Sequence, residues 1–350
     1  MANTSDPLNT EASINLIHQH SSDNQIAPET TLSLDLNIEY AISQTDLIGF
    51  HVEASTTPQK NGVSTVILDS NADSSSAVDH ADNGRIQVSE FFYQAALSDD
   101  KRFTIGLLNA TSFLDSSLIA NDENQQFITP SLVNNPVIDF PDYVIGLAYE
   151  SNLVKNVTST VFISSTHGIA DNQSRNYANL FELQKDEKGL FSAAEIQYMN
   201  KYWFINGGVW LHSGNHEALD DNTKLDLSNY GIYSNINKTL GNHTLGFRAG
   251  LANPKVSIAS EFISLAYQYS TKQTIFGLGY SKIITSGFNQ DDTLKNNQKM
   301  IELYSKYSFN ENISLTPTIQ FYNNPQIDTA LVKKVPNELY NLSLRLNYQF

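Results

Sequence analysis

The chain has 350 residues, no cysteine, 37 acidic and 21 basic residues, and a formal net charge of −16. Nucleic acid as a partner is excluded because phosphates require clustered Lys and Arg, and the missing cysteines exclude disulfides, thiol catalysis and cysteine-based metal sites. No window approaches the roughly 18 to 20 continuous apolar residues of a membrane-spanning helix. The negative mean hydropathy of −0.30 does not exclude membrane strands, because alternating strands average their apolar and polar faces.

Segments of about nine or more residues that alternate in polarity run through the whole chain. In residues 31–42, for example, Leu32, Leu34 and Leu36 face one way while Ser33 and Asp35 face the other. In chain order the predicted strands are 12–20, 31–42, 46–55, 84–97, 102–109, 142–150, 157–165, 190–198, 201–212, 226–237, 242–251, 260–270, 273–284, 299–309, 313–322 and 338–350.

The last ten residues, NLSLRLNYQF, alternate strictly and end on an aromatic residue. Leu342, Leu344 and Leu346 share one face, and Arg345 lies on the other. This pattern is typical of the strand that closes a bacterial outer-membrane β-barrel, whose outer face meets lipid and whose inner face meets water. The alternative is an edge strand of a soluble β-sandwich.

The connections between these strands alternate in length. Short turns at 43–45, 98–101, 200, 238–241, 271–272 and 310–312 must lie on one side, with long loops at 56–83, 110–141, 166–189, 213–225, 285–298 and 323–337 on the other. The apolar segment 176–184 would make the strand number odd, so we assign it to a long loop. The sequence therefore predicts one all-β domain over residues 1–350, a transmembrane antiparallel barrel of about 16 strands with both termini periplasmic.

Sixteen strands leave a water-filled lumen rather than a packed interior. Residues 110–141 form a long connection without strand alternation, and loops of that length are usually functional or disordered. The apolar residues Phe113, Leu118, Phe127 and Leu132 argue against disorder. We therefore expect loop 110–141 to fold inward and narrow the lumen.

Four stretches, GLLNATSFLDSSLIANDENQQFITPSLVNNP, GLFSAAEIQY, TPTIQFYNNP and the terminal NLSLRLNYQF, resemble the carbohydrate-selective outer-membrane porins. They span most of the chain from about Gly84 onward. The resemblance implies a barrel of roughly 16 strands through which sugars diffuse, narrowed by an inward-folded loop and lined by charged and aromatic groups. Where that family tends to have Gly-Lys-x-Asp, this chain has Gly106-Leu107-Leu108-Asn109, and it holds five arginines. Both departures argue against a strongly basic constriction.

The candidate pore and solute-binding residues come from the inward strand faces and the long loop. They are Glu39, Glu53, Glu90, Arg102, Asp115, Asn121, Asp122, Glu195, Trp210, Arg248, Tyr304 and Arg345. By parity Trp210 and Tyr304 could stack on pyranose faces, but ordinary packing against an inward loop is the favoured interpretation of both. Glu90 lies in a segment that is apolar on both faces, which suggests a bulge. Asp115, Asn121 and Asp122 would present acceptors to solutes or cap turns of the loop.

We predict no metal, no cofactor and no enzymatic activity. His212 and His216 in LHSGNH are four residues apart, the spacing of a helical metal site, but Gly214 opposes a helix. The pairs Asp220–Asp221 and Asp291–Asp292 are interpreted as solvated loop charge, with calcium binding or divalent bridging to lipopolysaccharide as the alternatives. The sequence contains no nucleophile elbow, phosphate loop or dinucleotide fingerprint, although an enzymatic barrel stays an alternative.

These features predict a passive porin in the outer membrane of a Gram-negative bacterium, a channel for sugars and other small hydrophilic solutes. Excess carboxylates predict a preference for cations in ion transport. The alternatives are a general or differently selective porin, and a non-conducting barrel acting as an adhesin or structural anchor. Expected partners are the lipid bilayer and lipopolysaccharide, together with the barrel-assembly machinery, which would recognise the carboxy-terminal strand. Whether the barrel forms homo-oligomers is left open. The polar start carries no secretory signal, so we expect Met1 to replace a removed leader.

Overall fold

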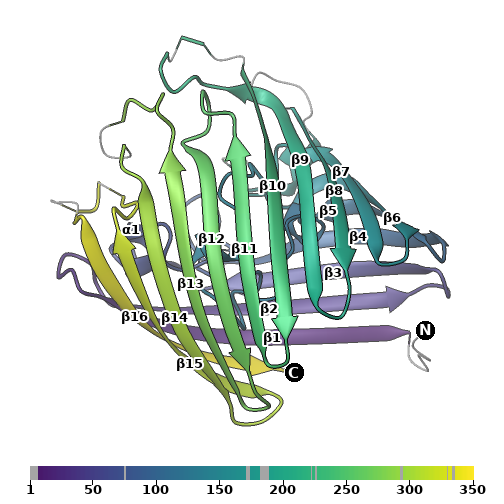
Figure 1. The fold of residues 1–350 in the computed structure, drawn as a ribbon, viewed down its shortest axis with the longest axis horizontal. Coiled ribbons are helices and arrows are strands. Elements are labelled where there is room, and N and C mark those ends of the chain that lie inside the picture. The colour runs from purple at the N-terminus through teal and green to yellow at the C-terminus, as the bar shows by residue number, and fades with distance from the viewer. Residues whose placement is uncertain are drawn as a thin grey trace.

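The computed structural model describes residues 7–74, 76–170, 174–181, 189–221, 223–224, 227–291, 295–328, 330–332 and 336–350. In this part of the chain sixteen strands form one closed barrel, and each pairs antiparallel with its sequence neighbours (Figure 1). The predicted sixteen-stranded antiparallel barrel is confirmed. The strands are β1 (Leu8–Ser21), β2 (Glu29–Ala41), β3 (Asp46–Ser55), β4 (Ile86–Ser98), β5 (Lys101–Leu108), β6 (Val144–Val154), β7 (Val157–Ser165), β8 (Leu190–Met199), β9 (Trp203–His216), β10 (Leu227–Leu240), β11 (His243–Ala252), β12 (Ala259–Ser270), β13 (Thr274–Thr285), β14 (Gln298–Ser308), β15 (Ile313–Asn323) and β16 (Glu338–Gln349).

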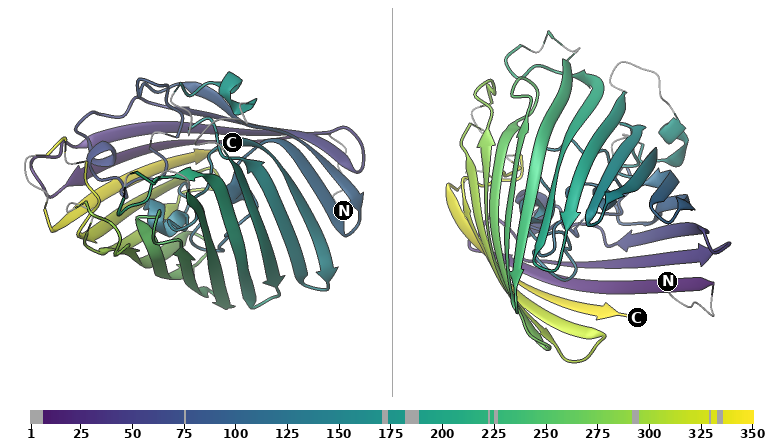
Figure 2. Two further views of the ribbon diagram at one scale, coloured as in Figure 1. Left: turned by 90° about the horizontal axis from the view of Figure 1, so that it is seen from above. Right: turned by 45° about the vertical axis from the view of Figure 1, so that its right-hand side comes forward.

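The barrel closes through its two terminal strands. β16 pairs antiparallel with β1, in a register that sets Gln349 opposite Ser13 and Asn341 opposite Ser21. The backbone N–H of Phe350 donates to the carbonyl oxygen of Ala12 at 2.9 Å. The purple first strand and the yellow last strand lie side by side in Figure 2. The terminal alternation therefore marks the closing seam, as predicted.

The polarity of the wall is the reverse of that in a soluble protein. On β16, Leu344 and Leu346 are 46% and 42% exposed, whereas Arg345 and Asn347 on the opposite face are 1% and 2% exposed. An exterior of leucine, isoleucine and aromatic side chains around a polar interior is the arrangement that a surrounding lipid phase requires. The fold therefore supports an outer-membrane location.

The connections follow the predicted parity. Residues 42–45, 99–100, 155–156, 200–202, 241–242, 271–273 and 309–312 join strand pairs at one end of the barrel, where the chain also enters β1 and leaves β16. The longer connections lie at the other end. Residues 177–181 of the apolar segment 176–184 form a 3₁₀ helix, η2 (Tyr177–Phe181), rather than a strand, and residues 182–184 lie outside the described residues.

The other helices are also single turns: α1 (Val63–Val66), α2 (Pro130–Val133) and η1 (Ala110–Ser112). Within the described residues, no helix combines the length and apolar character needed to cross a membrane.

Register shifts interrupt several strand pairs, and one of them lies in the segment where the sequence suggests a bulge. On β4, Glu90 pairs with His51 while Val88 pairs with Val52, so Ser89 is an extra residue and forms the suspected bulge. The bulge shifts the alternation by one, which explains why this segment is apolar on both faces. The predicted strands 46–55 and 157–165 match β3 and β7 at both ends, whereas β9 continues to His216, four residues beyond its predicted end.

Candidate functional site: the barrel interior

The connection between β5 and β6, residues 109–143, is tied to β11 by one arginine. Arg248 is 3% exposed and donates from Nη2 to the carbonyl oxygens of Asp115 and Ala120, both at 3.0 Å. Its Nη1 donates to the carbonyl oxygen of Val133 at 3.1 Å, and its Nε lies 3.3 Å from Asp115 Oδ2. Burial raises the pKa of Asp115 to about 6, and the Arg248 guanidinium opposes that rise. Arg248 thus binds residues from both halves of the loop.

Strands β14 and β16 hold the middle of the same loop. Glu302 on β14 is fully buried and accepts the backbone N–H groups of Ile128 at 2.9 Å and Thr129 at 3.0 Å. Arg345 on β16 donates to the carbonyl oxygens of Glu123 and Gln126, the latter at 2.8 Å. The charges of the wall are therefore satisfied by backbone dipoles of the loop, which is how a buried charge avoids its desolvation cost.

On the opposite arc of the barrel, Glu195 of β8 accepts the N–H of Asp115 and the hydroxyl of Tyr233, each at 2.8 Å. Asn206 of β9 and Asn235 of β10 donate their amides to the carbonyl oxygen of Ser116 at 2.7 and 2.6 Å. These bonds tie loop 109–143 to strands from β8 to β16, and Asn124 of the loop also bonds Asn15 of β1 and Asp35 of β2.

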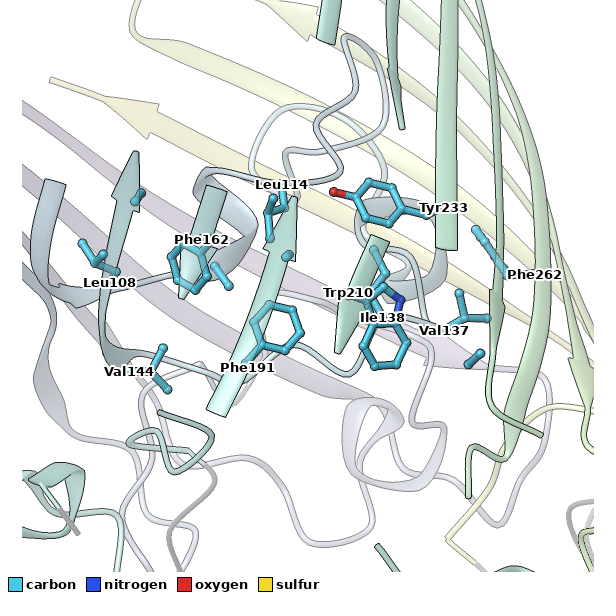
Figure 3. Close-up of a cluster of buried hydrophobic side chains, with 14 of the residues drawn as sticks. Leu108, Leu114, Val137, Ile138, Val144, Phe162, Phe191, Trp210, Tyr233 and Phe262 are labelled. Carbon is cyan, nitrogen blue, oxygen red and sulfur yellow. The ribbon is translucent and has the colours of Figure 1, made fainter. Parts of the chain in front are cut away.

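Apolar packing covers the rest of this contact. Figure 3 shows Leu114, Val137 and Ile138 of the loop among Phe162, Phe191, Trp210, Tyr233 and Phe262 of the strands. Trp210 is 3% exposed and lies stacked with Phe191 at a centroid distance of 6.3 Å.

Tyr304 is 1% exposed and meets Phe127 edge to face at 5.0 Å. Its hydroxyl donates to Gln268 at 3.1 Å. Both Trp210 and Tyr304 are buried among side chains of the wall and the loop, which is the packing role that the sequence favours for them. Aromatic rings bury a large apolar area, and the loop supplies a dry surface for it.

The β1–β4 side of the interior is different, because two adjoining cavities of about 500 and 250 Å³ lie there. Both are lined by Glu11, Asn37 and His51. The larger adds the carboxyl groups of Asp35, Glu53, Asp122 and Glu123, and the smaller adds those of Glu39 and Glu90. Neither cavity has Lys or Arg among its described lining residues. The space beside β1–β4 is therefore strongly acidic.

Within these cavities, several groups are paired with one another. His51 Nε2 lies 3.3 Å from Asp35 Oδ1, and its Nδ1 lies 3.8 Å from Glu90 Oε2. Glu90 also accepts the N–H of Asn109 at 2.7 Å, and Glu53 accepts a hydrogen bond from the Ser89 hydroxyl. Of the predicted site residues, the structure thus brings Glu39, Glu53, Glu90 and Asp122 to one acidic space.

The remaining predicted residues lie elsewhere. Asp115, Glu195, Trp210, Arg248, Tyr304 and Arg345 hold or pack the loop. Asn121 donates its N–H to Gln126 Oε1 at 2.9 Å within the loop, and Arg102 lies 3.6 Å from Glu150 with its side chain 54% exposed. Asp122 accepts the N–H groups of Asn124 and Gln125, the turn-capping role left open by the sequence.

The prediction did not include five residues that share these sites: Glu11, Asp35, His51, Glu123 and Glu302. Strand alternation alone sets Asp35 on the face of Glu39, and His51 on the face of Glu53. That signal was sufficient to include them. The same alternation sets Glu302 on the face of Tyr304, but no strand pattern reveals that its partners are backbone groups of the loop.

No family model matches the sequence. A curated protein of Aquifex aeolicus (strain VF5), described as uncharacterized, is 24% identical over 245 residues, covering 70% of this chain. The match spans 63% of that relative's length, less than two thirds.

Solved structures resemble the whole barrel. Pseudomonas putida OprB aligns with a TM-score of 0.75 at 11% identity, covering 98% of this chain and 94% of OprB. The Rh. blastica porin, as a mutant, aligns at 0.57 and 10% identity over 98% and 100% of the two chains. This is the fold of outer-membrane porins. The trimer form of Vibrio cholerae OmpT, an outer membrane protein, aligns at 0.59 and 12% identity over 98% and 99%.

Proposed function

We propose that the chain is an outer-membrane porin through which small hydrophilic solutes, sugars among them, diffuse down their gradients, with a preference for cations. The porin fold and the polar interior support a channel role. The observation that carries the proposal is the pair of acidic cavities beside β1–β4.

In this proposal loop 109–143 is the constriction. The loop is bonded at once to β8, β11, β14 and β16, which are spread around half of the ring. A segment with polar partners on the buried faces of such distant strands reaches all of them only from within the barrel. The loop then fills the β8–β16 side, and its Asn124 reaches across to Asn15 of β1 and Asp35 of β2. In this proposal the solute path is the open space that remains beside β1–β4.

Glycines in the wall support this close approach. A Cβ atom at Gly279 of β13 would lie 2.4 Å from Leu132 Cδ1, and one at Gly250 of β11 would lie 2.4 Å from Val137 Cγ2. Real Cβ contacts are never that short, so larger residues at these two positions would push the loop away from the wall.

The preference for cations follows from Coulomb interactions. Carboxylates that line a narrow, water-filled path with low-dielectric walls concentrate cations and repel anions. The lining supplies Glu11, Asp35 and Glu39 along the wall. His51 is the cationic candidate among the lining residues, and carboxylates surround it.

Sugars enter the proposal through the sequence resemblance to the carbohydrate-selective outer-membrane porins. Carboxylate and amide oxygens of the path accept hydrogen bonds from sugar hydroxyls. Because the rings of Trp210 and Tyr304 are buried, recognition in this path relies on hydrogen bonds rather than on stacking with those two residues.

Planar-bilayer recording tests both the cation preference and the passage of sugars. In a KCl gradient we expect single-channel steps with a reversal potential on the K⁺ side, and we expect added oligosaccharides to block current in proportion to concentration. A reversal potential on the Cl⁻ side would overturn the cation preference. Current unaltered by oligosaccharides would remove the sugar assignment, and a barrel without conductance steps would refute the channel.

A further inference from the structure

The carboxy-terminal end of β9 places two histidines next to a carboxylate of loop 109–143. His216 Nε2 lies 2.8 Å from Asp139 Oδ2, and the rings of His212 and His216 are 4.6 Å apart between centroids. One ligand atom from each of these three side chains lies within 4.8 Å of the other two. Two imidazoles and one carboxylate therefore lie close enough together to share one ion.

A strand irregularity makes this approach possible. His212 pairs with Asn229 and His216 pairs with Leu227, so a four-residue step on β9 faces a two-residue step on β10. In a regular strand, residues four apart would stand about 13 Å apart at about 3.3 Å per residue. The two extra residues bulge out and bring the imidazoles together, and bulges of this kind recur beside functional sites.

The hydrogen bonds of His216 define which nitrogen is free. Its Nδ1 lies 2.9 Å from the carbonyl oxygen of Gly214 and 3.1 Å from that of Leu227. Carbonyl oxygens only accept, so Nδ1 carries the proton, and in the neutral ring Nε2 presents a lone pair. That lone pair meets Asp139 Oδ2, a second acceptor, and such a contact needs a proton or a cation between the two atoms.

Metal-binding histidines commonly show this arrangement, with the distal ring N–H anchored on a backbone carbonyl. Two further atoms at the site have no hydrogen-bond partner among the described residues: His212 Nδ1 and Asn229 Oδ1. Asn229 is 4% exposed, and its Nδ2 donates to Asp139 Oδ2 at 3.1 Å. Rotating this amide by half a turn would present its oxygen to the same point.

We propose that Asp139, His212 and His216 bind a divalent transition-metal ion of the Zn²⁺ class, with Asn229 Oδ1 or water as a further ligand. Imidazole nitrogens favour Zn²⁺ over Ca²⁺ or Mg²⁺, which take oxygen ligands. Zn²⁺ bonds of about 2.0–2.1 Å in a tetrahedron put ligand atoms roughly 3.3 Å apart. On ion binding, the 2.8 Å distance between His216 Nε2 and Asp139 Oδ2 would then lengthen slightly. The longer distances to His212 would shorten through rotation of the side chains.

A bound ion could enter from a neighbouring cavity, and it would link the loop to the barrel wall. A cavity of about 560 Å³, lined by Asp139, His216 and Asn229, adjoins the site. Asp139 belongs to the arm of loop 109–143 that returns to β6, while both histidines belong to the wall. A bound ion would tie this arm to β9 with bonds stronger than the single hydrogen bond that His216 and Asp139 make without it.

The experiment is titration of the chelator-treated, detergent-solubilised barrel with ZnCl₂ by isothermal calorimetry. We expect one site per chain, and we expect His216→Gln or Asp139→Asn to weaken it at least about 100-fold, since even losing an outer hydrogen bond costs 10–100-fold. His80→Gln is the matched control, because His80 is an exposed loop histidine. A heat-modifiable gel shift confirms that each variant is a folded barrel.

A second group, Asp35, His51 and Glu53, could also gather around a cation. It holds one imidazole, and it lies in the acidic path. Zn²⁺ binding that survives His216→Gln but is lost in His51→Gln would overturn the proposal, as would the absence of binding to the wild type. With Co²⁺ in place of Zn²⁺, intense visible absorption of a tetrahedral site that disappears in His212→Gln would support it independently of calorimetry.

Discussion

The two sides of the barrel interior use the same kind of residue in opposite ways. On the β1–β4 side Glu39 is exposed in a cavity. On the other side Glu195 is 3% exposed, and it accepts the Asp115 N–H and the Tyr233 hydroxyl. Both carboxylates occupy inward positions of strands that alternate alike. The contrast teaches that loop 109–143, and not the strand pattern, decides whether an inward charge lines a cavity or serves as an anchor.

The charged anchors share one chemical principle. Arg248 and Arg345 donate to loop carbonyl oxygens, while Glu195 and Glu302 accept loop N–H groups. Hydrogen bonds to charged groups contribute roughly 1.5–3 kcal/mol each, more than neutral ones. The loop is thereby held by charges that bond to its backbone, and Arg248 also forms an ion pair with a loop carboxyl, that of Asp115.

Arg248→Met is expected to have the largest effect. It removes the donor to Asp115 O, Ala120 O and Val133 O, and it leaves the buried Asp115 carboxyl without its cation. Breaking one partner of a buried pair costs about 3–5 kcal/mol. We expect a lower unfolding temperature and a larger, noisier single-channel conductance as the loop loosens. A conductance equal to that of the wild type would show that the loop does not depend on this anchor.

Neutralising carboxyl groups on the β1–β4 side is expected to change the ion selectivity. In the triple variant Asp35→Asn, Glu39→Gln and Glu90→Gln, the ratio of K⁺ to Cl⁻ permeability should fall about fivefold, as local potentials of a few kT disappear. The reversal potential in a KCl gradient measures it. Glu217→Gln, at an exposed position, is the matched control and should leave the ratio unchanged. An unchanged ratio in the triple variant would place the ion path elsewhere.

Selectivity should also depend on pH through the loop carboxyl that faces the acidic cavity. Burial, together with the nearby Asp73 and Asp122, raises the pKa of Glu123 to about 8. Glu123 is therefore protonated and neutral below that pH, and it gains negative charge above it. We expect the preference for K⁺ to rise about twofold between pH 7 and 9, and to lose this step in Glu123→Gln. A fall in cation preference over that range would contradict the assignment.

Arg102→Gln should have the smallest effect. Arg102 lies 3.6 Å from Glu150, its side chain is 54% exposed, and such pairs contribute about 0–1 kcal/mol. Thermal unfolding and single-channel conductance should both stay close to wild type. A loss of thermal stability as large as that of Arg248→Met would mean that exposure does not distinguish the surface arginine Arg102 from the buried Arg248.

Much of the barrel could be predicted because its signals are local. Alternation over nine or more residues identifies a strand wherever one face meets lipid, and β3 and β7 agree with prediction at both ends. Strand ends that differ from the prediction have physical causes. β9 runs on to His216 through a bulge, and its Gly214 and two histidines do not follow a period-2 pattern.

The roles of the inward residues were harder to predict. Arg248 and Arg345 were expected to face solute, yet both are buried against loop backbone 100 or more residues away along the chain. The histidines of LHSGNH were judged by helical spacing, whereas a strand bulge brings them together. Each of these outcomes depends on contacts that neither the pattern nor the composition of a single segment contains.

The sequence by itself determined the number and direction of the strands, the closing seam at Phe350 and the acidic character of the chain, because alternation, turn length and charge are properties of neighbouring residues. Only the tertiary structure decided which inward charges line open space and which hold the loop. The reason is that the burial of a charge depends on where a 35-residue connection passes within a closed barrel, and that path is determined by the sum of many distant contacts.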